Sequence, residues 1–236
     1  MTAESNRGAG HESHRHPARA DLARRWAETV RAARDGADGP GPSPEPYAEN
    51  LLDRWAEPQR RYHTTDHLLA VLDRVDVLEA HRERPADPAA VRLAAWFHDA
   101  VYLPDRSENE ERSARLAERA LAELGVGAER TAEVVRLVRL TVSHDPADGD
   151  GDGAVLCDAD LAILASPPAA YAAYAAAVRE EYGFVPDDAF RAGRAAVLRQ
   201  LLDLPRLFRT SYGERMWAGP ARRNLTDELA RLTKAP

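Results

Sequence analysis

The chain has 236 residues, a length that suits one large domain or one domain with an extension. Its formal net charge of −7 provides no general attraction to anionic polymers, so we expect neither a specific nucleic acid nor a membrane as a partner. The single cysteine excludes a disulfide framework, and no run approaches the roughly 18 apolar residues of a membrane span. We therefore expect a soluble, cytoplasmic protein, and the sequence leaves open whether it forms a homo-oligomer.

The composition favours helices over strands. Hydrophobic residues account for 44% of the chain, and many of them are the good helix formers Ala and Leu. Aromatic residues reach only 6%, and alternating runs rich in Val, Ile and Thr are scarce. We predict an all-α fold in which loops and helix ends carry the chemistry.

The N-terminal part predicts three segments. Residues 1–16 are polar and contain glycine, which predicts a disordered tail. Residues 18–33 repeat apolar side chains at helical spacing, which predicts an additional N-terminal helix. Residues 35–46 are rich in Pro and Gly and predict a loop. Because one helix cannot bury a core alone, we assign residues 17–236 to a single all-helical domain.

Beyond this loop, apolar residues recur at helical spacing almost throughout. The predicted helices cover residues 47–57, 65–83, 88–98, 107–124, 129–143, 155–165, 168–182, 187–203 and 220–233. Asp87-Pro88 has the pattern of a capped helix start, and Gly125 is a natural C-terminal stop. The acidic, glycine-rich segment 145–153 predicts a loop.

Three segments place polar side chains that can bind metal within otherwise apolar helical surroundings. They are His63 and His67 in residues 60–69, His98 and Asp99 in residues 93–102, and Asp158 and Asp160 in residues 155–164. A charged Asp in such a run should be paired or bound to metal, because leaving it alone in a core costs several kcal/mol. Imidazoles together with carboxylates suit a divalent metal such as Mn, Mg, Fe, Co, Ni or Zn.

The order of these residues resembles the HD superfamily of metal-dependent phosphohydrolases. His67 comes first, the pair His98-Asp99 follows, and a distant Asp lies in the segment DADL. The resemblance covers about residues 47–233 and is greatest to a bacterial group with YHT..HL, WFHDAVY, NEE.SA and DADLAILA segments. That group is known largely as predicted hydrolases, so the resemblance indicates a chemistry and an HD-type helical bundle rather than a substrate.

The resemblance implies a role for each matching residue. His67, His98, Asp99 and Asp160 would bind the metal, with Asp158 as the competing choice for the fourth ligand. Asp160 is preferred because the family's ligand is usually the Asp of an Ala-Asp step. His63 is similar to the histidine that protonates the leaving oxygen in cyclic nucleotide phosphodiesterases. The expected reaction is attack of a metal-activated water on a small phosphorylated substrate, with a nucleotide as the expected type.

Glu110 and His144 each have two interpretations. Glu110, the candidate for positioning the water or a second metal, could instead be an acid favoured at a helix start. Glu111 is the weaker alternative to Glu110. His144 would either bind a second metal or cap a helix C-terminus.

Four arginines are candidates for binding phosphate. Arg60 and Arg61 directly precede the Tyr62-His63 step, and their alternative is pairing with surface acids. Arg179 and Arg194 lie in the C-terminal half, where buttressing of the helices is the alternative.

Two other functions compete with phosphate hydrolysis. Some HD proteins bind a pair of irons and act as oxygenases, which would require extra ligands, for which Glu110 and His144 are candidates. A catalytically inactive module that binds nucleotide or metal is the third hypothesis. The intact set of four candidate ligands argues against that module.

Overall fold

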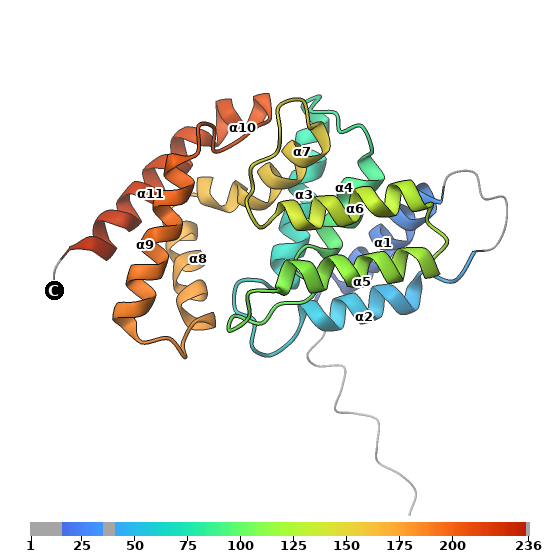
Figure 1. Ribbon diagram of the computed structural model, residues 1–236, viewed down its shortest axis with the longest axis horizontal. Helices are drawn as coiled ribbons and strands as arrows, with labels where there is room; N and C mark the ends of the chain where they lie inside the picture. Colours follow the sequence, from blue (N-terminus) through green and yellow to red (C-terminus); the bar gives the residue numbers. More distant parts are fainter. Residues whose placement is uncertain (1–15, 35–40, 235–236) are drawn as a thin grey trace, which may run out of the picture.

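The computed structural model describes residues 16–34 and 41–234, and within them it contains helices and no strands (Figure 1). The elements are α1 (Arg19–Ala33), α2 (Glu45–Trp55), α3 (Thr65–Ala80), α4 (Pro88–Phe97), α5 (Asn109–Glu123), α6 (Ala128–Leu140), α7 (Gly151–Leu161), the 3₁₀ turn η1 (Ala162–Ala165), α8 (Pro168–Glu181), α9 (Asp187–Asp203), α10 (Ser211–Met216) and α11 (Ala218–Thr233). The all-α prediction is confirmed.

The predicted tail and the first half of the predicted loop lie largely outside the described residues. Of the tail, only His16 is described, and its Nε2 lies 2.8 Å from Asp66 Oδ1. Residues 41–44 are not helical, as predicted, but α2 already begins at Glu45, with Pro46 in its first turn, where proline is well tolerated.

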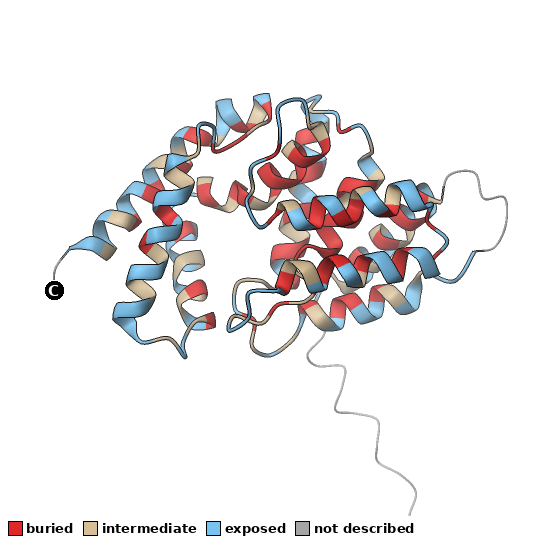
Figure 2. Cartoon of the chain, viewed as in Figure 1, coloured by how far each residue is buried: buried red, intermediate tan, exposed pale blue. Residues whose placement is uncertain are grey.

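The apolar side chains form two clusters. The larger one is built by α1 to α7 and includes Trp26, Trp55 and Trp96, each fully buried. The smaller one is built by η1, α8, α9, α11 and the segment before α10, around side chains such as Tyr171 and Phe208. Trp217 packs against both clusters, and Figure 2 shows that buried residues are much denser in α3, α4 and α7 than in α9 and α11.

The helix α4 is the centre of the larger cluster because it is apolar nearly all round. The Asp87 carboxylate accepts a hydrogen bond from the Ala90 N–H and Pro88 occupies the first turn, so the helix begins where the sequence predicts. Almost every residue from Ala90 to Phe97 is buried. A helix of this kind belongs in the interior of a protein, and its C-terminal end delivers His98 to a buried position and Asp99 to a partly buried one.

The structure corrects three details of the prediction. The loop predicted over 145–153 is shorter, because α7 begins at Gly151, where Asp150 accepts a hydrogen bond from the Gly153 N–H. The helix predicted over 155–165 ends as α7 at Leu161 and continues only as a 3₁₀ turn. The helix α10 was not predicted, since its six residues are too few to show a hydrophobic period.

Among the described residues, no helix taken singly has the length and apolar character needed to cross a membrane. The bent pair formed by residues 151–165 and 168–181 meets the criterion by length and composition when the two parts are taken together.

We expect Trp26→Ala to lower the free energy of unfolding by about 3–5 kcal/mol, the usual cost of truncating a buried aromatic residue. The Trp26 ring makes edge contacts with Trp96 and Phe97, and its Nε1–H donates to the Pro44 carbonyl oxygen. Arg31→Ala, at an exposed position of the same helix, should change the free energy of unfolding by less than about 0.5 kcal/mol. Urea unfolding measures both, and similar values for the two variants would mean that α1 is not part of the core.

Candidate metal centre

Three buried or nearly buried side chains from different helices converge at one point. His67 lies on the inner face of α3, His98 directly follows α4, and Asp160 lies near the end of α7. The Nε2 atoms of His67 and His98 are 3.2 Å apart, and Asp160 Oδ1 lies 3.1 Å from the former and 3.6 Å from the latter. This cluster could hold a metal ion.

The environment of His67 favours the neutral ring that a metal requires, and a backbone contact orients the ring of His98. Burial, aided by the neighbouring imidazoles of His98 and His63, lowers the pKa of His67 despite the opposing effect of Asp160. The Nδ1 atom of His98 lies 2.9 Å from the Ala95 carbonyl oxygen. That acceptor requires the ring proton on Nδ1 and leaves the lone pair of Nε2 directed at the cluster.

Asp99, the fourth predicted ligand, lies beside this cluster. Its Oδ2 is 3.3 Å from His98 Nε2 and 4.0 Å from His67 Nε2, and it is also 3.9 Å from His63 Nε2. All four predicted ligands therefore meet in one place, although they come from segments far apart in the sequence. Oxygen and nitrogen donors in this combination fit a borderline or hard divalent cation.

The structure separates the two candidates for the aspartate ligand. Asp158 and Asp160 are two residues apart on α7, so they point in nearly opposite directions. The Asp158 carboxylate is fully buried, where it accepts hydrogen bonds from Arg209 N, Thr210 N and the Thr210 hydroxyl. Burial raises the pKa of Asp158 to about 6 despite these bonds. Asp158 thus stabilises the turn before α10, and Asp160 is the residue in the cluster.

His144 contacts the second oxygen of Asp160. Its Nε2 lies 2.8 Å from Asp160 Oδ2, and its backbone φ of 51° is in the left-handed region. Although burial alone would raise the pKa of Asp160, the imidazoles of His98, His144 and His67 hold it well below its usual value. Asp160 is therefore an ionised carboxylate with an imidazole on each side.

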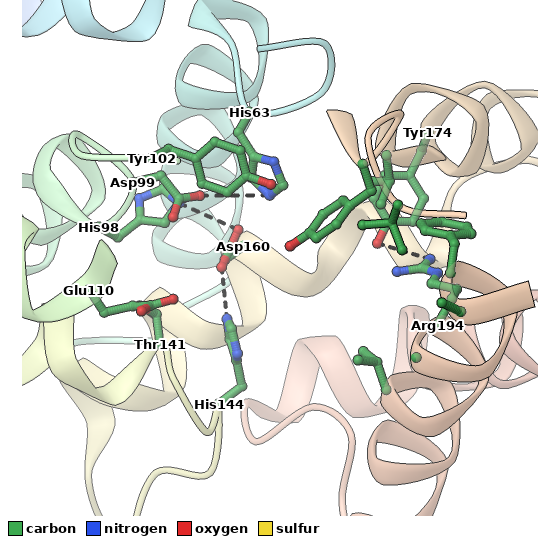
Figure 3. Close-up of a pocket in the computed structure, with 17 residues that line it drawn as sticks. His63, His98, Asp99, Tyr102, Glu110, Thr141, His144, Asp160, Tyr174 and Arg194 are labelled. Carbon is green, nitrogen blue, oxygen red and sulfur yellow. Dashed lines mark hydrogen bonds and ion pairs between the residues drawn. The ribbon is translucent and has the colours of Figure 1, made fainter. Parts of the chain in front are cut away.

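The cluster opens into a cavity of about 530 Å³ (Figure 3). His63, His98, Asp99, Asp160 and His144 line it on the side of α3 to α7, and Glu110 lines it from the first turn of α5. Glu110 is therefore close enough to act on a bound molecule. Glu111 faces away, because its carboxylate pairs on the surface with Arg115 and Arg139.

Of the four candidate arginines, one lines the cavity. Arg194 does so, while its guanidinium pairs with Glu228 at 2.8 Å and donates to the Tyr174 hydroxyl. Arg61 is half exposed and lies 3.7 Å from Glu180 Oε2. Arg179 donates to the carbonyl oxygens of Tyr182 and Val185 and pairs with Asp187. It therefore stabilises the connection between α8 and α9.

Arg60 does not fit the phosphate-binding role that its position in the sequence suggested. Its side chain is fully buried and its guanidinium donates to the carbonyl oxygens of His63, Asp99 and Ala100. The same group also donates to the Glu57 carboxylate. With its N–H groups occupied in this way, Arg60 ties the segment before α3 to the turn that carries Asp99, and thereby orients both.

Glu181, at the end of α8, is a site residue for which the sequence indicated no role. Its Oε1 accepts hydrogen bonds from the backbone N–H groups of residues 61, 62 and 63, and its Oε2 lies 2.7 Å from His63 Nδ1 and accepts from the Tyr102 hydroxyl. The available signal was the spacing Tyr171, Val178, Glu181, which places the acid on the apolar face of its helix.

The pKa values of Glu181 and His63 reflect this contact. Burial would raise the pKa of Glu181, but the hydrogen bond from His63, its positive charge and the three backbone donors lower that pKa to about 2. Burial likewise opposes the charge of His63, yet Glu181, Asp99 and Asp160 raise the pKa of His63 above its usual value. The His63 ring is thus held with Nδ1 toward Glu181 and Nε2 toward Asp99.

We expect Glu181→Gln to destabilise the protein in a pH-dependent manner. The folded-state pKa of about 2 lies below the usual value of ~4.3, so the carboxylate contributes stability above pH ~4.3 that is lost as the pH falls toward 2. The loss in the variant should be about 3 kcal/mol at pH 6 and less than half of that at pH 3. Urea unfolding at both pH values measures it.

Glu180→Gln is the matched control for this prediction. Glu180 is the neighbouring residue, but its side chain is 67% exposed. We expect a change within about 0.5 kcal/mol at both pH values. A loss in Glu181→Gln that is the same at pH 3 and pH 6 would contradict the assigned role of the carboxylate.

The chain matches no family model, no curated protein and no solved structure. The likeness to the HD superfamily therefore stays a prediction from the residues and their order. The cluster of His67, His98 and Asp160 is a finding of the structure that does not depend on that likeness.

Proposed function

We propose that this chain is a divalent-metal-dependent phosphohydrolase that acts on a small phosphorylated substrate. The observation that carries the proposal is the convergence of His67, His98 and Asp160 at one side of a cavity, with Asp99 beside them. The order of these residues in the chain, which resembles the HD superfamily, supports the same chemistry. A bound divalent cation would supply a water of lowered pKa and would stabilise negative charge on the phosphate oxygens.

The residues around the cluster have distinct tasks in this reaction. Asp160 and Asp99 provide the negative charge that attracts the cation, and the lone pairs of the two histidines complete the donor set. His63 lines the same cavity, is held by Glu181 through Nδ1, and directs Nε2 toward Asp99. The raised pKa of His63 favours the protonated ring, which can give the Nε2 proton to the departing oxygen of the substrate.

A pair of metal ions is the second candidate arrangement, and one contact favours it. The two oxygens of Asp160 face different partners, since Oδ1 lies near His67 and His98 and Oδ2 near His144. A carboxylate in this position can bridge two cations, and Glu110 lines the same cavity. Elemental analysis that finds two irons per chain, together with oxygen consumption by the iron-loaded protein, would favour an oxygenase over the hydrolase.

We expect His98→Gln to lose bound metal and to reduce phosphate release by at least about 100-fold, because loss of even a supporting partner of a ligand usually costs 10–100-fold. The substrates are phosphate esters assayed with Mn, Mg, Co and Ni. His81→Gln is the matched control, since His81 is exposed and stacks on Tyr212 away from the cavity. If His98→Gln retains both full metal content and activity, the proposed site is wrong.

The role of His63 can be tested through the leaving group. We expect His63→Gln to slow the hydrolysis of an alkyl phosphate by about 10²- to 10⁴-fold, because an alkoxide needs a proton to depart. Hydrolysis of 4-nitrophenyl phosphate should slow much less, since its leaving group is stable as an anion. Comparing kcat for both esters in wild type and variant measures the difference, and an equal loss for both esters would exclude proton donation by His63.

A further inference from the structure

The cavity has two walls of opposite character. The wall that carries the candidate metal ligands is polar and ionisable. The facing wall is built by α8 and α9, and the side chains there are mostly apolar: Val178, Val185, Ala189, Phe190 and Val197. In Figure 3, His98, Asp99 and Asp160 lie across the cavity from Tyr174 and Arg194. A ligand that fills the cavity therefore meets ionisable groups at one end and a mostly apolar surface at the other.

The charges near the apolar wall are already neutralised. Arg194 lines the cavity, but its guanidinium is paired with Glu228 and its side chain is only 9% exposed. Arg179 lies behind the wall, 4.7 Å from the Phe190 ring, and its donors are bound to two backbone carbonyls and Asp187. A second phosphate group at this end would find no unpaired cation among the described residues that line the cavity.

The apolar wall includes an exposed valine. Val197 lines the cavity on α9 and is 46% exposed. A neighbouring hollow shares Val197, Asp160 and His144 with the cavity and adds Val142, which is 66% exposed. Apolar surface beside a polar site is covered favourably by the apolar part of a ligand.

We infer that the phosphate ester taken by this site is a monoester whose organic group is uncharged and largely apolar, of the aryl or alkyl type, rather than a nucleotide with several phosphates. The inference rests on the proposed function for its reaction, but the binding preference stands on the cavity alone. The phosphate faces the metal cluster and the organic group lies against α8 and α9. Val197 is then a residue that determines specificity.

The test compares three non-hydrolysable probes by calorimetric titration of the full chain, with and without Mn: phenylphosphonate, methylphosphonate and the β,γ-methylene analogue of ATP. We expect phenylphosphonate to bind at least about 10-fold more tightly than methylphosphonate, because burial of even one methylene group in an apolar pocket is worth 10-fold or more. Phenylphosphonate that binds no more tightly than methylphosphonate, or less tightly than the nucleotide analogue, would overturn the inference.

Two matched variants locate the preference on this wall. Val197→Asn should weaken the binding of phenylphosphonate about 5- to 10-fold, since it removes apolar contact without adding charge. The affinity for methylphosphonate should stay within about 2-fold of the wild-type value. Val77→Asn is the control, because Val77 is a similarly exposed valine at 39% on α3, where it lines none of the cavities described above. Equal effects of the two variants on phenylphosphonate would overturn the assignment of Val197.

The outcomes separate this inference from the proposed function. If the phenyl preference is found but no phosphate is released from any ester with any metal, the hydrolase proposal fails and the binding preference holds. If phosphate is released but methylphosphonate and phenylphosphonate bind equally well, the hydrolase holds and the apolar preference fails.

Discussion

The carboxylate of Glu181 holds the two parts of the molecule together at the cavity. It belongs to α8, in the smaller apolar cluster, yet its hydrogen-bond donors lie in the segment before α3 and at Tyr102, in the larger part. A buried carboxylate is costly unless its oxygens are satisfied, and here five donors satisfy them. The interaction holds the ring of His63 and joins α8, on one wall of the cavity, to the segment before α3, on the other.

The candidate metal ligands form a second group of closely spaced polar side chains. The Nε2 atoms of His67 and His98 lie 3.2 Å apart, with Asp160 Oδ1 close to both and the His144 imidazole at the other oxygen of Asp160. The fold supports this arrangement from behind, since Trp55 packs against both histidine rings and Arg60 fixes the turn that carries Asp99. Such a rigid, preformed donor set is what binding of a divalent cation requires.

The division into two apolar clusters also shapes the proposed substrate. The larger cluster supplies the ionisable wall because its inner helices α3, α4 and α7 bring His67, His98 and Asp160 together at one opening. The smaller cluster contributes α8 and α9, whose valines and phenylalanine face that opening. A site assembled in this way recognises an anion and a hydrocarbon at the same time, which agrees with the monoester preference that we infer.

Helical class, the approximate bounds of most helices and the four candidate ligands could be read from the chain, because periodicity and polar residues inside apolar runs are local signals. The preference for Asp160 over Asp158 came from the resemblance alone, since both lie in the same apolar run and only the packing of α7 shows which of them faces the cluster. Arg60 was expected to meet phosphate and is instead enclosed by backbone carbonyls. Glu181 acquires its partners from residues 79 to 120 positions away, so its role arises only when the helices pack.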